Sequence, residues 1–187
     1  MAATSDEARP TLGTTLDLGR FRGALARFAT GVTVVGHRAD DDSPKGITVN
    51  AFSAVSLDPP LVLVAIARRA RSHDLLRGKP FSVNVLKVEQ EPLARHFAGE
   101  PQDVEIRWVK GVVAPRLAEP LAWLECEPWA DHDGGDHTLF VGRVVDFLFG
   151  DADALGFYQS RFVPVARPVP SQPPVPYDPF ELPYDAP

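Results

Sequence analysis

The chain has very little cysteine: Cys126 is the only one among 187 residues. A single thiol excludes an intrachain disulfide and any metal site built from several cysteines. Because disulfides are rare in reducing compartments, we expect a cytoplasmic protein. Long apolar runs are also missing: no stretch is long enough to span a membrane, and residues 1–15 lack the apolar segment of a secretory signal. The sequence therefore predicts no membrane association.

An excess of positive charge is absent too. The chain has 19 Lys and Arg against 25 Asp and Glu, a formal net charge of -6. Proteins that bind nucleic acid need broad clusters of cations to neutralise phosphates, so we expect no nucleic-acid partner. The one basic cluster, Arg68, Arg69 and Arg71, is large enough for one or two phosphate groups only.

Several common catalytic motifs are missing. The sequence contains no G-x-G-x-x-G, no G-x-x-x-x-G-K-[ST], no G-x-S-x-G and no H-E-x-x-H. These absences disfavour a Rossmann dehydrogenase, a P-loop enzyme, a serine hydrolase and a zinc protease.

What is present is the composition of an ordinary globular domain, with 44% hydrophobic and 24% charged residues. Residues 1–15 are polar and predict a disordered lead-in. Residues 16–163 form the predicted domain. Residues 164–187 contain nine prolines and predict an extended tail, because proline at this density prevents regular structure. Two interpretations of the tail stay open: a disordered end, or a segment whose aromatic residues dock on the domain or on a second subunit, namely Tyr177, Phe180 and Tyr184.

The spacing of apolar residues predicts a mainly β protein with peripheral helices. Apolar residues recur every three or four positions from Asp17, which predicts an amphipathic helix capped by Asp17 and ended by Gly31. Short helices are expected at 71–78 and 88–98. Roughly seven strands against three helices, with few helical crossovers, favour an antiparallel barrel. The strands are expected within 31–38, 45–56, 61–67, 81–86, 121–129 and 137–149.

The predicted strand at 45–56 is unusually rich in polar side chains. Thr48, Asn50, Ser53 and Ser56 lie among apolar residues. Buried polar groups need partners, so these residues either face solvent on an edge strand or contact a ligand. The pattern alone leaves both interpretations open.

The basic cluster precedes a predicted helix. Ser72 is placed to cap this helix, with Arg69 and Arg71 alongside, an arrangement suited to an anion. The alternative is a capped surface helix with solvated arginines.

Residues 132–137, HDGGDH, contain imidazole and carboxylate groups but match no standard metal spacing. Asp-Gly-Gly-Asp between two strands is explained by a hairpin turn, so we predict no metal site. His137 then begins a strand at the rim of the barrel, where its ring can stack on a planar ligand.

Together these segments resemble the flavin reductase family with the FMN-binding split-barrel fold, the reductase components of two-component monooxygenases. The resemblance covers about residues 17–163. It rests on FRGALARFATGVTVV (21–35), GITVNAFSAVSLDPPLVLV (46–64), RSHDLL (71–76), FSVNVL (81–86) and GDHTLFVGRV (135–144).

The resemblance implies a homodimer with a flavin, FMN or FAD, at the subunit interface, and NADH or NADPH as hydride donor. It implies that His137 places the nicotinamide. Arg71 and Ser72 are implied contacts of the flavin phosphate, and Arg161 matches the family's closing segment. The remaining implied flavin contacts are Gly46, Thr48, Val49, Asn50, Ser53, Ala54, Ser56 and Asn84.

The implied function is an NAD(P)H:flavin oxidoreductase that supplies reduced flavin to a flavin-dependent monooxygenase. Family habit favours NADH and FAD, and no arginine can be assigned to the 2′-phosphate of NADPH. The main alternative is a flavin carrier or storage module without nicotinamide turnover. An oxidase like the pyridoxamine-phosphate-oxidase split barrels fits the motifs less well.

Overall fold

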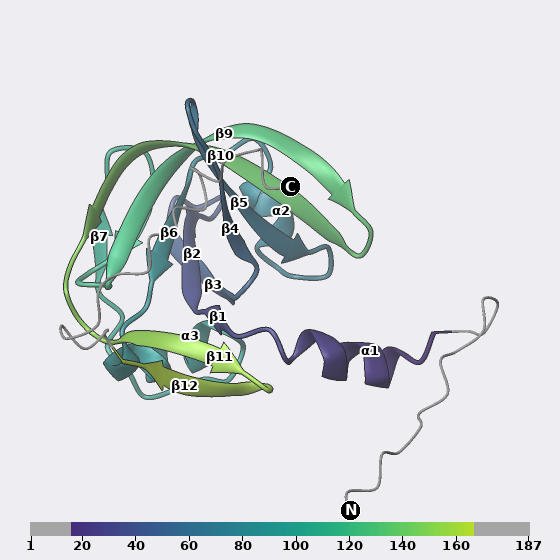
Figure 1. Ribbon diagram of the computed structural model, residues 1–187. Coiled ribbons are helices and arrows are strands. Elements are labelled where there is room, and N and C mark those ends of the chain that lie inside the picture. The colour runs from purple at the N-terminus through teal and green to yellow at the C-terminus, as the bar shows by residue number, and fades with distance from the viewer. Residues whose placement is uncertain (1–15, 167–187) are drawn as a thin grey trace, which may run out of the picture.

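The computed structural model describes residues 16–166 (Figure 1). The predictions for residues 1–15 and for the proline-rich tail from residue 167 onward lie outside the described residues. Within 16–166 the mainly β prediction is confirmed. The helices are α1 (Leu18–Leu25), α2 (His73–Leu76), the 3-10 helix η1 (Val88–Gln90) and α3 (Glu91–Phe97). The strands are β1 (Thr30–Gly31), β2 (Thr33–Arg38), β3 (Pro44–Val49), β4 (Phe52–Leu57), β5 (Pro60–Ala67), β6 (Phe81–Val85), β7 (Trp108–Lys110), β8 (Pro115–Leu117), β9 (Ala122–Gly134), β10 (His137–Phe149), β11 (Ala154–Tyr158) and β12 (Arg161–Val165).

A seven-stranded antiparallel sheet in the order β3-β2-β6-β9-β10-β5-β4 forms the body of the domain. Figure 1 shows its strands curving around a common interior. The side chains of Val35, Val64, Phe81, Cys126 and Phe140 fill this interior, all at most 2% exposed. From Leu61 onward, buried and partly buried residues alternate along β5, the period-two pattern expected of a strand with one fully buried face.

The prediction of a single strand over 45–56 is wrong. The chain bends at Asn50 and Ala51, so β3 and β4 are separate strands at opposite ends of the sheet order. β3 pairs with β2, whereas β4 pairs with β5. Residues 47–56 contain no glycine or proline, so the sequence has no strong turn signal that would reveal this break.

A smaller sheet, β1-β11-β12, lies below the barrel in Figure 1. Together with α3 it covers a second apolar cluster that includes Val32, Leu86, Leu117 and Leu155. The predicted helix at 88–98 is therefore confirmed as η1 followed by α3.

The predicted cap of α1 is confirmed, because the Asp17 carboxylate accepts hydrogen bonds from Gly19 N and Arg20 N. The predicted end at Gly31 is wrong: α1 ends at Leu25, since Thr30 and Gly31 pair with β11. No residue of α1 is buried, and Figure 1 shows the helix projecting away from the barrel. In the described part of the chain, no helix has the length and hydrophobicity of a membrane span.

Candidate functional site

A groove of about 960 Å³ lies between β3, the segment after β5, and the end of α3. This volume is within the range usual for small-molecule sites. Its walls come from segments far apart in the sequence. The lining residues are Pro44, Lys45, Gly46, Ile47, Thr48, Ala67, Arg69, Ala70, Arg71, Ser72, His96, Phe97, Ala98, Gly99, Pro101, Ile106 and Trp108.

The groove differs in charge from the chain as a whole. Lys45, Arg69 and Arg71 contribute three cations to its lining, and no aspartate or glutamate is among the lining residues. In a chain of net charge -6, this concentrates positive potential at one place. The groove is therefore suited to a ligand with a phosphate group.

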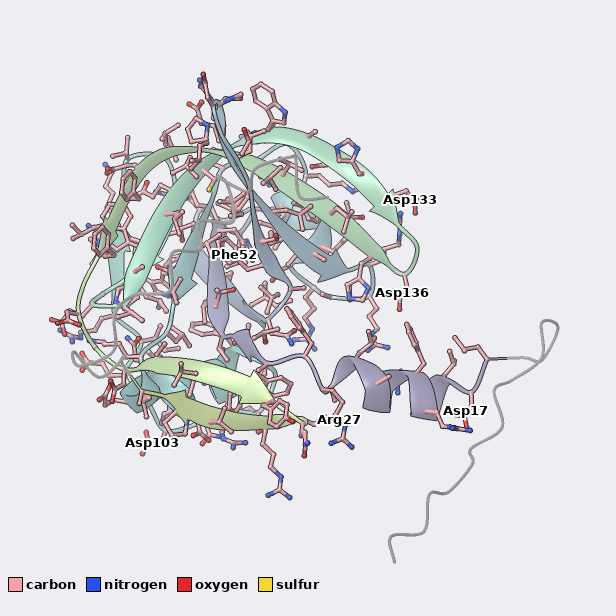
Figure 2. The ribbon with its side chains drawn as sticks, viewed as in Figure 1. Asp17, Arg27, Phe52, Asp103, Asp133 and Asp136 are labelled. Atoms are coloured by element: carbon pink, nitrogen blue, oxygen red, sulfur yellow. The ribbon has the colours of Figure 1, made fainter. Side chains whose placement is uncertain are left out.

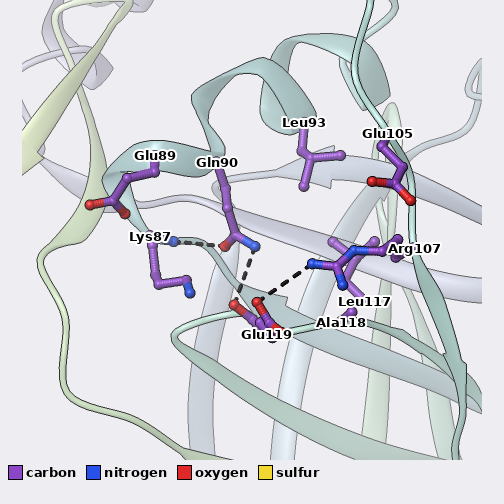
Figure 3. Close-up of a pocket in the computed structure, with 9 residues that line it drawn as sticks. All are labelled: Lys87, Glu89, Gln90, Leu93, Glu105, Arg107, Leu117, Ala118 and Glu119. Carbon is purple, nitrogen blue, oxygen red and sulfur yellow. Dashed lines mark hydrogen bonds and ion pairs between the residues drawn. The ribbon is translucent and has the colours of Figure 1, made fainter.

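A second hollow, of about 300 Å³, has the opposite character (Figure 3). It lies between η1 and β8, and Glu89, Glu105 and Glu119 line it together with Lys87 and Arg107. Arg107 Nη2 lies 3.5 Å from Glu119 Oε2, so one of the two cations in this hollow is already paired with a carboxylate. Three carboxylates disfavour an anionic ligand there.

The floor of the groove depends on a glycine. A Cβ atom at Gly46 would lie 2.9 Å from Val34 Cγ1 and 3.0 Å from the Phe97 ring, closer than van der Waals contact permits. Phe97 in turn packs edge-to-face on Trp108, with ring centroids 5.8 Å apart. Glycine at position 46 therefore lets an aromatic wall approach β3, and a planar ligand can rest against such a wall.

The basic segment after β5 is tied to the β9–β10 hairpin. Arg68 donates from Nε to Gly135 O (2.8 Å) and from Nη2 to Asp133 Oδ2 (2.9 Å), while its backbone N donates to Asp136 O (2.9 Å). Asp133 and Asp136 both lie at the hairpin tip (Figure 2). The hairpin and the groove wall are thereby held together.

A buried histidine forms a second connection between the segment after β5 and β10. His73 is 4% exposed and packs edge-to-face on Phe140. Its Nδ1 lies 2.7 Å from Asp74 Oδ1, and its Nε2 lies 2.8 Å from Thr138 Oγ1. Because Thr138 directly follows His137, this contact links α2 to the start of β10.

His137 stands beside the groove. Its Cα partner in the sheet is Ala67, which lines the groove. The imidazole is 41% exposed, and Nδ1 donates to Asp136 Oδ1 at 2.7 Å. This hydrogen bond, together with the charge of the imidazole, lowers the pKa of Asp136. With Nδ1 engaged, Nε2 is the nitrogen left to contact a ligand.

The protein-family model described as flavin reductase like domain matches residues 25–166 of the sequence. Over 168 residues the chain is 44% identical to an NADH-dependent flavin reductase of Rhodococcus sp, a match that covers 87% of this chain and 92% of that protein. It is 36% identical to the reductase component of a 4-nitrophenol 4-monooxygenase/4-nitrocatechol 2-monooxygenase of Rhodococcus opacus, over 79% and 80% of the two chains. The chain belongs to the flavin reductase family.

Solved structures of flavin reductases share this fold. The flavin reductase PheA2 superposes with a TM-score of 0.77 at 34% identity, over 81% of this chain and all of that chain. The Streptomyces globisporus C-1027 NADH:FAD oxidoreductase SgcE6, in complex with NAD and FAD fragments, superposes with a TM-score of 0.72 at 37% identity, over 83% and 94% of the two chains. The predicted split-barrel fold is confirmed.

Four of the residues that the family resemblance suggested line the groove: Gly46, Thr48, Arg71 and Ser72. The Thr48 hydroxyl donates to Ala94 O at 2.7 Å, so its oxygen keeps only acceptor capacity. The proposed helix cap by Ser72 is wrong. Ser72 has helical backbone angles and makes no side-chain cap bond, because α2 is a single turn of four residues.

The other suggested residues lie outside the groove lining. Val49 and Asn50 are at the end of β3, and β4 carries Ser53, Ala54 and Ser56 at the far end of the sheet order. Arg161 begins β12 in the smaller sheet. Their contact with flavin stays a prediction.

Asn84 does not face the groove as expected, because it is 0% exposed. Its amide donates to Val34 O (2.9 Å) and Ser82 Oγ (3.0 Å) and accepts from Leu117 N (2.9 Å). These bonds satisfy its polar atoms inside the protein, so the residue joins β6 to β2 and β8.

Several residues of the groove have no signal in the sequence. Lys45 falls within a predicted strand, and His96, Phe97 and Trp108 belong to no recognisable motif. They reach the groove through α3 and β7, whose packing against β3 depends on contacts distant in sequence. Among the described residues, no group of three or more His, Cys, Asp or Glu side chains is arranged to hold a metal ion.

Proposed function

We propose that this protein is an NADH-dependent flavin reductase that reduces FAD or FMN and supplies the reduced flavin to a flavin-dependent monooxygenase. The observation that carries the proposal is a cationic groove without carboxylates, adjoining His137. The cations of the groove suit the flavin phosphate, and its aromatic wall suits the planar isoalloxazine ring. Relatives named NADH-dependent FAD reductase and monooxygenase reductase components support the same activity.

The residues of the groove bind and orient the two nucleotides. When both are bound, the nicotinamide of NADH gives a hydride to the flavin ring, which leaves NAD⁺ and, with one proton, reduced flavin. Arg71 holds the phosphate end, and backbone around Gly46 and Thr48 lies against the ring. We assign His137 to the nicotinamide. The further assigned flavin contacts are Val49, Asn50, Ser53, Ala54, Ser56, Ser72 and Arg161.

This activity needs positioning and no protein nucleophile. Burial raises the pKa of the Cys126 thiol to about 12, and the neighbouring Glu125 carboxylate adds to the shift. The thiol is therefore protonated and unreactive at neutral pH. Holding two rings in a reactive arrangement accounts for rate enhancement without an acid–base pair.

We assign the protein as a homodimer, since large apolar side chains are exposed on two separate elements. Leu18 and Leu25 of α1 and Phe28 just after it are 58–77% exposed, and Phe147 and Phe149 near the end of β10 are 62% and 75% exposed. Surfaces of this kind in a soluble protein usually meet another chain. Light scattering of the full chain should give about twice its mass of 20.4 kDa, and a mass of 20.4 kDa would contradict the assignment.

The monooxygenase is the consumer of the reduced flavin, and we place both proteins in the cytoplasm. NADH is assigned over NADPH because relatives are named for NADH.

The first test measures loss of absorbance at 340 nm with the full chain, NADH or NADPH, and FMN, FAD or riboflavin in every pairing. We expect flavin-dependent oxidation that is faster with NADH than with NADPH. A carrier or storage module would bind flavin and oxidise neither nucleotide, and that outcome would overturn the proposed function.

His137→Ala should raise the KM for NADH about tenfold and leave flavin affinity nearly unchanged, because a stacking and hydrogen-bonding contact to the nicotinamide is lost. Steady-state kinetics and flavin titration measure the two quantities separately. The matched control is His132→Ala, an exposed histidine of the same hairpin, which should change neither. Equal loss of flavin and NADH binding would show that the role assigned to His137 is wrong.

A further inference from the structure

A third hollow, of about 310 Å³, adjoins the groove. The two share Pro44 and Trp108, which form the boundary between them. β7 and the start of β8 form its other side, through Val109, Lys110 and Pro115. A ligand bound in the groove and long enough to pass this boundary would enter the hollow.

The surface of this hollow is partly apolar and includes an aromatic ring. Trp108 is half-buried, packed edge-to-face on Phe97 and seated over Gly36, where a Cβ atom would lie 3.0 Å from its ring. Val109 and Pro115 extend the apolar surface beside it. A planar aromatic group can stack on such a surface.

The hollow also carries a free positive charge. Arg38 Nη1 is paired with Asp42 Oδ2 at 3.2 Å, so these two charges offset each other. Lys110 is exposed, and within residues 16–166 its ammonium group has no hydrogen bond or ion pair. On the groove side of the boundary, Lys45 adds a second exposed cation next to Pro44.

We propose that this hollow binds the adenosine-phosphate half of a dinucleotide whose other half lies in the groove. Adenine is planar and suits the Trp108 surface, and the linking pyrophosphate suits Lys45 and Lys110 on the two sides of the boundary. The hollow beside η1 is the less suitable choice, because its three carboxylates repel phosphate. The inference rests on the proposed function, and FAD and NADH both carry this adenosine-phosphate half.

The direct test is calorimetric titration of the full chain with AMP, which needs no catalytic turnover. Lys110→Glu should weaken AMP binding about tenfold or more, since an attractive charge becomes repulsive. Lys110→Met keeps the aliphatic stem and removes the charge, and should give a smaller loss. Lys87→Glu makes the same charge change in the hollow beside η1 and should leave AMP binding unchanged.

Kinetics then distinguish the two sources of the adenosine group. A raised KM for FAD in Lys110→Glu, with unchanged KM for FMN and riboflavin, assigns the hollow to FAD. A raised KM for NADH measured with FMN as acceptor assigns it to NADH. Unchanged AMP binding in a folded Lys110→Glu variant, or unchanged KM values for both dinucleotides, would overturn the proposal. If the unsubstituted chain binds AMP through Lys110 but oxidises no NADH with any flavin, the proposed function fails and the AMP site stands.

Discussion

The pairing of β5 with β10 is the constraint on which the candidate site depends. Seven residue pairs, from His137 with Ala67 to Arg143 with Leu61, set the register. Because side chains alternate between the two faces of a strand, a shift by one residue would reverse every side chain of β5. The register thus determines that the chain leaves β5 beside His137, so that Arg69 and Arg71 enter the groove.

Two side-chain contacts strengthen this register at its end. Arg68 hydrogen-bonds to the tip of the β9–β10 hairpin, and His73, the first residue of α2, hydrogen-bonds to Thr138. The Arg68 contacts are exposed and contribute little to stability individually, whereas the hydrogen bond between His73 and Thr138 is buried and shielded from water. The cations of the groove and His137 therefore belong to one connected unit, although Arg71 and His137 are 66 positions apart in the sequence.

The sequence predicts those elements that depend only on a few neighbouring residues. Asp17 capping α1, the Gly135 turn and the apolar alternation of β5 are all properties of a few neighbouring residues. Local sequence does not reveal the break at Asn50. The break places β3 and β4 at opposite ends of the sheet order, and it has no strong turn motif. The wall of the groove that α3 and β7 form has no local signal for a similar reason. Phe97 and Trp108 reach the groove only through tertiary packing, and Phe97 lies against Gly46. The prediction for Asn84 is wrong because a polar residue in a strand is equally consistent with a ligand contact and with buried hydrogen bonds.

The central claim is that the cations of the groove hold the phosphate end of a flavin. Arg71 is the cation to test: it is exposed, and within residues 16–166 it makes no ion pair. The most direct measurement compares KM for FMN and for riboflavin, which lacks the phosphate, in Arg71→Ala, with Arg77→Ala beyond α2 as control. The account predicts a KM for FMN raised about tenfold and an unchanged KM for riboflavin. Equal changes for the two flavins, or no change for FMN, would contradict it.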